Sequence, residues 1–153
     1  MAVSIRKITL WRTAVEHRPG ALADLLEPLA TAGADLQIVM GYRIPGQKTR
    51  AIIEVAPVGT RKVALAAERA GLAPGGAPTL LVLGDNRAGL AIRIARALSD
   101  SGVNIAFLVA QVVGRRYSAV FGFDNEGDLD KAADRIRAAV TSRARLPVIA
   151  RRR

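Results

Sequence analysis

Two short segments of this chain place polar residues beside a glycine, and both have the same layout. They read EHRPG at residues 16–20 and DNRAG at residues 85–89, so their glycines lie 69 residues apart. A glycine turn that opens a helix leaves backbone N–H groups without partners next to such polar side chains. At the edge of a sheet, a turn of this kind suits the binding of a small polar ligand.

The elements that position these turns are repeated too. Leu29 and Leu98 share the 69-residue separation, as do Gly33 and Gly102, which indicates an internal duplication. Four leucines follow the first turn at the spacing of one buried helix face: Leu22, Leu25, Leu26 and Leu29. The residues expected to face the sheet in the second repeat are Ile94, Leu98, Leu129 and Ile136.

The order of the apolar patterns predicts an α+β fold. Strands are expected at 5–15, 36–44, 49–56, 79–84, 103–113, 116–123 and 146–150. Helices are expected from Gly20 to Gly33 and at 59–70, 89–101 and 129–140. This order gives two ferredoxin-like βαββαβ repeats, each an antiparallel sheet with both helices on one face. A glycine and proline linker at 73–78 divides repeat one, residues 1–76, from repeat two, residues 77–153.

The 69-residue period assigns one stretch of the chain to two different strands. With the 69-residue period, the last strand of repeat one and the first strand of repeat two both fall on residues 77–81. We therefore expect either seven principal strands or a very short strand near Leu72. Another segment must then complete the edge of the first sheet. Because unpaired edges invite pairing, we expect a strand contact between chains or repeats, and a homodimer or higher oligomer.

The composition excludes several classes of site. The 153 residues include no cysteine and one histidine, His17, which removes disulfides, thiolate zinc sites, a cysteine nucleophile and multi-histidine metal sites. We expect neither a catalytic centre nor a cofactor or metal. No apolar run approaches the roughly 20 residues that cross a bilayer, and the first residues lack the apolar centre of a signal peptide. These observations predict a cytoplasmic protein without a membrane partner.

The formal net charge of +10 raises the possibility of nucleic-acid binding. However, 19 of the 23 basic residues are arginines, and most are scattered singly instead of clustering with aromatic residues. The exception is the C-terminus, with Arg143, Arg145 and residues 151–153. A frayed basic tail is the favoured interpretation of that cluster.

The repeated segments resemble the opening of ACT domains. The resemblance lies in Arg18-Pro19-Gly20-Ala21-Leu22 with Gly33-Ala34-Asp35-Leu36, and in Asn86-Arg87-Ala88-Gly89-Leu90 with Gly102-Val103-Asn104-Ile105. The helix from Gly89 is similar to the ACT repeats of aspartate kinases, and the resemblance covers nearly the whole chain. It implies domains that associate side by side and bind amino acids at their interface.

The resemblance also implies which residues bind the ligand: the turn of one unit and the start of the second strand of its neighbour. In repeat one these are Glu16, His17, Arg18, Pro19, Gly20, Ala21, Leu22 and Asp35. In repeat two they are Asp85, Asn86, Arg87, Ala88, Gly89, Leu90 and Asn104.

The chemistry of an amino acid suits these positions. Its carboxylate needs donors, and the backbone N–H groups of Ala21 and Leu22, or of Leu90 and Ala91, are expected to be free at a helix start. An asparagine amide both donates and accepts, whereas Asp35 adds a charge that makes the two sites unequal. The alternative is structural: the glycines permit only a sharp turn, and Asp35 and Asn104 only end one.

The sequence predicts a non-catalytic regulatory protein that binds a small amino acid and acts through its oligomer or a partner. The first alternative is a regulatory subunit of an amino-acid biosynthetic enzyme, of the aspartate kinase or acetohydroxyacid synthase type, with a catalytic subunit as partner. A less favoured alternative is a nucleic-acid-binding module that acts through its arginines.

Overall fold

The computed structural model describes residues 3–142, which divide into two compact units. Residues 8–76 form one unit, here called the first repeat. Residues 77–142 form the other unit together with residues 3–7, here called the second repeat. Each unit has a four-stranded antiparallel core with two helices, so the predicted α+β, ferredoxin-like class is confirmed.

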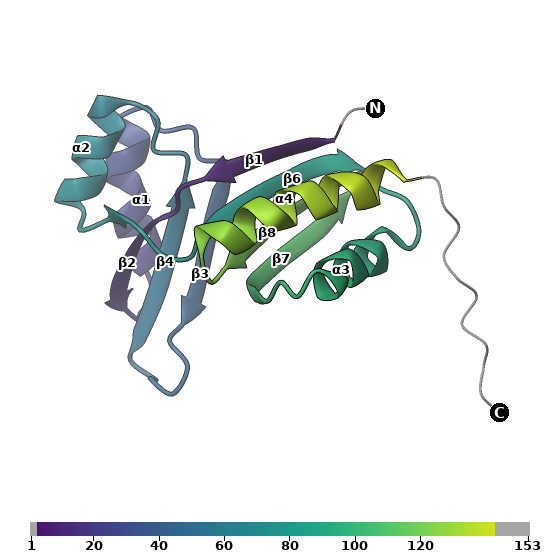
Figure 1. The fold of residues 1–153 in the computed structure, drawn as a ribbon. Coiled ribbons are helices and arrows are strands. Elements are labelled where there is room, and N and C mark those ends of the chain that lie inside the picture. Colours follow the sequence, from purple (N-terminus) through teal and green to yellow (C-terminus); the bar gives the residue numbers. More distant parts are fainter. Residues whose placement is uncertain (1–2, 143–153) are drawn as a thin grey trace. The chain divides into compact units, whose positions relative to one another are not determined.

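The first repeat has the sheet order β3-β4-β2-β5. Figure 1 labels strands β2, β3 and β4 of this sheet together with helices α1 and α2. Strand β2 pairs antiparallel with β4 and with β5, and β3 pairs antiparallel with β4. Its elements are β2 (Trp11–Glu16), α1 (Ala21–Thr31), β3 (Ile38–Arg43), β4 (Arg50–Ala56), α2 (Arg61–Arg69) and β5 (Ala73–Pro74). The helices pack on the sheet face that carries Ile53 and Val55, which join Leu25, Leu29 and Ala67 in one core.

The second repeat has the sheet order β1-β6-β8-β7. Its elements are β1 (Ser4–Ile8), β6 (Thr79–Asp85), α3 (Leu90–Asp100), β7 (Ile105–Val113), β8 (Arg116–Phe123) and α4 (Glu126–Thr141). Helices α3 and α4 share a core with β6 and β8. The strand predicted at 146–150 and the basic tail lie outside the described residues. Beside β6, the edge position of this sheet is taken by β1.

The prediction of one long strand over residues 5–15 was wrong. The segment forms two strands, β1 and β2, separated by Thr9 and Leu10, and they belong to different sheets. Apolar alternation reports that residues are extended, but it does not report which sheet each one joins. The very short strand expected near Leu72 is present as the two-residue β5, so the described residues form eight strands.

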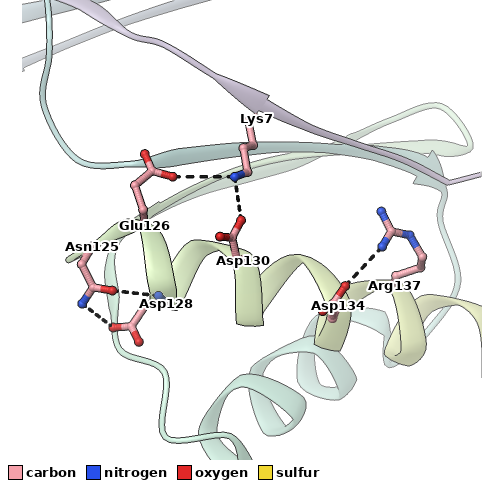
Figure 2. Close-up of polar contacts among 7 residues, drawn as sticks. All are labelled: Lys7, Asn125, Glu126, Asp128, Asp130, Asp134 and Arg137. Atoms are coloured by element: carbon pink, nitrogen blue, oxygen red, sulfur yellow. Dashed lines mark hydrogen bonds and ion pairs between the residues drawn. The ribbon is translucent and has the colours of Figure 1, made fainter.

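Strand β1 is attached to the second repeat by apolar and ionic contacts. Val3 and Ile5 pack against its core. Figure 2 shows the Lys7 ammonium group between two carboxylates of α4, 2.6 Å from Asp130 Oδ1 and 3.8 Å from Glu126 Oε2. The hydrogen bond and charge of Asp130 raise the pKa of Lys7 above its ordinary value. These contacts hold the first strand of the chain in a sheet built from its second half.

The predicted helix faces are confirmed except in the first turn of α1. Ile94, Leu98, Leu129 and Ile136 are buried in the core of the second repeat. In α1 the buried residues are Leu25 and Leu29. Leu26 is partly buried, and Leu22 is 44% exposed, so its predicted place in the core was wrong. Leu22 is the second residue of α1, so it lies in the first turn of the helix, before the buried Leu25.

Candidate functional site

Both repeated turns use glycine to start a helix. Gly20 precedes α1 with φ of 87°, and Gly89 precedes α3 with φ of 79°. Residues with a Cβ rarely adopt this left-handed conformation, which explains why glycine recurs after 69 residues. The turn of the second repeat is tied to the neighbouring hairpin, because the Asn86 N–H donates to the Arg115 carbonyl at 2.8 Å.

Half of the expected free donors are already used inside the turns. The Ala21 N–H donates to the Arg18 carbonyl at 3.3 Å, and the Leu90 N–H donates to the Arg87 carbonyl at 3.2 Å. The prediction that these two N–H groups are free to bind a ligand was therefore wrong. For Leu22 and Ala91, the structure of residues 3–142 shows no backbone acceptor. The helix starts keep one of the two predicted donors each.

The Arg87 side chain is engaged within the second repeat. Its Nη2 donates to the Val140 carbonyl at 2.7 Å and to the Ser142 carbonyl at 3.0 Å, both at the end of α4. Arg93 Nη1 donates to the same Ser142 carbonyl at 2.7 Å. Positive charge at the C-terminal end of a helix is stabilising because the carbonyls there lack helical partners. Arg87 therefore anchors the turn to α4.

The corresponding arginine of the first repeat folds back onto its own turn. Arg18 Nη2 lies 2.7 Å from Asp24 Oδ2, and its Nη1 donates to the Pro19 carbonyl at 3.0 Å. The hydrogen bond and charge of Asp24 raise the pKa of Arg18. The Glu16 carboxylate lies 3.7 Å from Arg18 Nε. His17 is exposed and donates its backbone N–H to the Thr49 carbonyl at 2.8 Å. The first turn is thus more polar and more charged than the second.

Asp35 and Asn104 lie far from the turns of their own repeats. In the second repeat, Asp85 and Val113 both pair with Arg116 at one end of the sheet. Asn104 precedes Ile105, which pairs with Phe123 at the other end. With about 3.3 Å per residue, the nine residues of β7 separate these ends by roughly 27 Å. Asn86 and Asn104 therefore do not form a site within one repeat, and the same register argument applies to Asp35.

A cavity of about 310 Å³ lies beside the turn of the second repeat. One wall is α3, which contributes Leu90, Ala91, Ile94 and Ala95. The other wall is the edge strand β7, with Ile105, Leu108 and Val112 among its residues, and Ala119 and Phe121 of β8 form the floor. Only Asn86 and Gln111 contribute polar side chains besides Tyr117. The cavity is therefore strongly apolar with polar groups near the turn.

Tyr117 lines this cavity and has a hydroxyl group without a hydrogen-bond partner among residues 3–142. It is 7% exposed, and its hydroxyl is buried without a hydrogen-bond partner among the described residues. Its ring lies over Gly84, where an added Cβ would come within 2.9 Å of the hydroxyl oxygen. Burial raises the pKa of Tyr117, while the charges of Arg87 and Arg116 act in the opposite direction. A buried polar group without a partner costs about 1–3 kcal/mol.

The sequence analysis named Asn86 and Leu90 as binding residues and Ala91 as a backbone donor, but it assigned no binding role to the other residues of this cavity. A signal was present in the repeat. The positions that correspond to Ala91 and Ala95 after the 69-residue shift are Leu22 and Leu26. Two small residues in place of two large ones leave space on one side of α3.

Comparisons with solved structures identify the fold. The chain is similar to protein BT0572 from Bacteroides thetaiotaomicron, with a TM-score of 0.71 and 16% identity over 87% of this chain and 88% of that one. It is also similar to the ligand-free regulatory subunit of aspartate kinase from Thermus thermophilus, with a TM-score of 0.58 and 15% identity over 90% and 95%. A structure of aspartokinase alpha and beta subunits is also similar, with a TM-score of 0.61 and 15% identity over 93% of this chain and 99% of that one.

These similarities confirm the predicted tandem of two ACT-like repeats. No family model and no curated protein matches the sequence. Within residues 3–142, no helix is both long enough and apolar enough to span a bilayer.

Proposed function

We propose that this chain is a non-catalytic regulatory protein that binds a small amino acid at the turn of its second repeat. The observation that carries the proposal is the meeting of Asn86, the unpaired Ala91 N–H and an apolar cavity at one helix start. A carboxylate suits the helix N-terminus, and the Asn86 amide accepts from an ammonium group. The regulatory subunit of Thermus aspartate kinase, which shares the fold, supports a regulatory role.

A second copy of the chain supports this site by pairing along β7. This edge strand exposes apolar side chains on both faces, including Leu108, Val109, Val112 and Val113. Exposed apolar edges of this length promote pairing between chains. In an antiparallel β7 pair, the start of one strand lies beside the end of the other. Asn104 of a second copy would then approach Asn86, which gives the predicted interface residue a role.

Two measurements test the proposal. Thermal-shift measurements with the twenty amino acids should reveal at least one that raises the melting temperature, because a ligand selective for the folded state stabilises it. Calorimetry should then show that Asn104→Ala weakens binding by more than about tenfold, as expected for loss of a hydrogen bond to a charged group. Asp35→Ala is the matched variant from the other repeat. The interface site is rejected when both variants bind as tightly as the wild type.

The oligomer is tested separately. Sedimentation at micromolar concentration should show more than one chain, and Val109→Lys should shift the protein towards the monomer because charge on an edge strand opposes pairing. A wild-type protein that sediments as a monomer would remove the role of Asn104.

A second candidate function is the regulation of a separate catalytic chain, and the length that this chain shares with a known regulatory subunit favours it. This chain covers 95% of the Thermus regulatory subunit, so a protein of this length and fold occurs as a subunit of a kinase. Co-purification with a catalytic polypeptide would favour this function over an autonomous sensor. A cytoplasmic location stays a prediction.

A further inference from the structure

A groove of about 490 Å³ lies between helices α1 and α2 of the first repeat. Figure 1 labels both helices. Helix α1 contributes Pro28, Thr31 and Ala32 to the groove. Helix α2 contributes residues at the spacing i, i+3, i+4, i+7 and i+8, which lie along one side of a helix: Lys62, Leu65, Ala66, Arg69 and Ala70. None of these residues lines the cavity beside α3, so the groove is a separate surface.

The groove is open because the residues between the two helices are small. Ala32, Ala66 and Ala70 are half-buried and form its floor. Pro28 and Leu65 line it from opposite helices and are exposed, with 41% of Leu65 accessible to solvent. Apolar surface that polar residues border is typical of a site for protein–protein contact.

The border of the groove on α2 is positively charged. Lys62 and Arg69 are exposed, and neither makes an ion pair with another residue of 3–142. With about 1.5 Å per residue, their positions lie about 10 Å apart along the helix, or two turns. The carboxylates of Glu27 and Glu68 are on the same two helices but do not line the groove. An anionic partner is therefore complementary to it.

The groove continues along the seam of the two helices. A second hollow of about 300 Å³ shares Pro28 and Ala70 with it. The charged residues of that hollow already pair with one another, because Arg18 contacts both Asp24 and Glu16. The seam is thus elongated, and its unpaired charge lies at Lys62 and Arg69. An elongated apolar seam suits a helix better than a small anion, which would leave the floor uncovered.

From these observations we infer that the α1–α2 groove binds an amphipathic helix of a partner protein. The apolar side of that helix enters the groove, and two of its carboxylates, two helical turns apart, pair with Lys62 and Arg69. A basic helix would bring like charges together at both positions. The inference goes beyond the proposed ligand site, because it gives the first repeat a separate role in binding a partner.

A synthetic helical peptide tests the chemistry of the partner. The peptide carries leucines at i, i+3, i+4 and i+7 and two glutamates that are two turns apart beside them. A matched peptide has lysines in place of the glutamates. In fluorescence anisotropy with the full chain, the acidic peptide should bind at least about tenfold more tightly, because two attractive charge pairs replace two repulsive ones. Absence of binding by the acidic peptide, or equal binding of both peptides, would overturn the inference.

Charge reversal in the protein tests the location. Lys62→Glu and Arg69→Glu should each weaken the acidic peptide at least about threefold, and the double variant at least about tenfold. Arg61→Glu is the matched control, since Arg61 is exposed on the same helix but does not line the groove. Equal losses in Arg61→Glu and Lys62→Glu would mean that net charge alone attracts the peptide, and would overturn the inference.

Filling the groove tests the apolar contact. Ala66→Leu should weaken the acidic peptide at least about tenfold, because the added side chain occupies the floor. Ala23→Leu, at an exposed position of α1 outside the groove, should bind it like the wild type. Unchanged binding in Ala66→Leu would overturn the inference, as would a changed sedimentation coefficient of the protein alone, which would assign the groove to a second copy. Amino-acid binding in the second repeat uses none of these residues, so the proposed function is tested separately.

Discussion

Replacing Tyr117 with phenylalanine removes one oxygen atom and leaves the ring over Gly84. This oxygen is buried and has no partner among residues 3–142. The cost of burying such a group is about 1–3 kcal/mol, so Tyr117→Phe should raise the free energy of unfolding by about 1 kcal/mol. Most core substitutions destabilise, and the expected sign is therefore unusual.

The same change should weaken ligand binding. If the hydroxyl donates to the carboxylate of the ligand, its loss costs about 1.5 kcal/mol, which is about a tenfold increase in Kd. Urea denaturation of the free protein and calorimetry with the best amino acid measure the two effects independently. A residue with a purely structural role would not give higher stability together with weaker binding.

The variant has a clear opposite outcome. A fall in the stability of free Tyr117→Phe would mean that the hydroxyl already has a partner, such as water, and that burial does not leave it unsatisfied. Unchanged affinity would show that the Tyr117 hydroxyl does not contribute to ligand binding. Tyr42→Phe serves as the control, because the Tyr42 hydroxyl donates to Glu54 Oε2 at 3.1 Å and its removal should destabilise the first repeat.

Three further substitutions test the fold around the site. Leu29→Ala should lower stability by about 2–5 kcal/mol in urea denaturation, since Leu29 is fully buried in the first repeat, and a near-neutral effect would show that the helix face is misassigned. Arg87→Ala should cost about 1–2 kcal/mol because the end of α4 loses one of its two arginines, whereas Arg96→Ala on exposed α3 surface should change little. Gly84→Ala should cost about 1–3 kcal/mol, because its Cβ would meet the Tyr117 ring at 2.8 Å; wild-type stability would show that the ring moves freely.

The duplication could be predicted because local rules apply to each copy separately. A positive φ demands glycine at Gly20 and Gly89, and the i, i+3, i+4 spacing of apolar residues marks a helix wherever it occurs. These signals were sufficient for the α+β class and both turns, whereas the short strand near Leu72 was one of two alternatives that the 69-residue period left open. They also placed Asn86 at the edge of what the structure shows to be a cavity.

The path of the first strand could not be predicted from these local signals. Residues on either side of Thr9 and Leu10 are extended in both interpretations, and only long-range pairing decides that β1 joins β6 while β2 joins β4. The contacts of Lys7 with Asp130 connect residues 123 positions apart, which no local pattern reports.

Arg18 and Arg87 also show that similar local sequence can lead to different tertiary contacts. Both Arg18 and Arg87 precede a glycine turn by two residues, and their sequence context is nearly identical. Tertiary structure gives Arg18 a carboxylate of its own helix and gives Arg87 the carbonyls of α4, more than fifty residues away in the chain.

The sequence by itself determined that the chain contains two copies of one unit and where each copy turns, because backbone conformation and helix periodicity depend on near neighbours. Only the tertiary structure decided that the Tyr117 hydroxyl is buried without a partner and that Ala91 and Ala95 leave a cavity beside β7. Burial and empty volume depend on side chains brought together from distant strands and helices, and their packing is a property of the assembled fold.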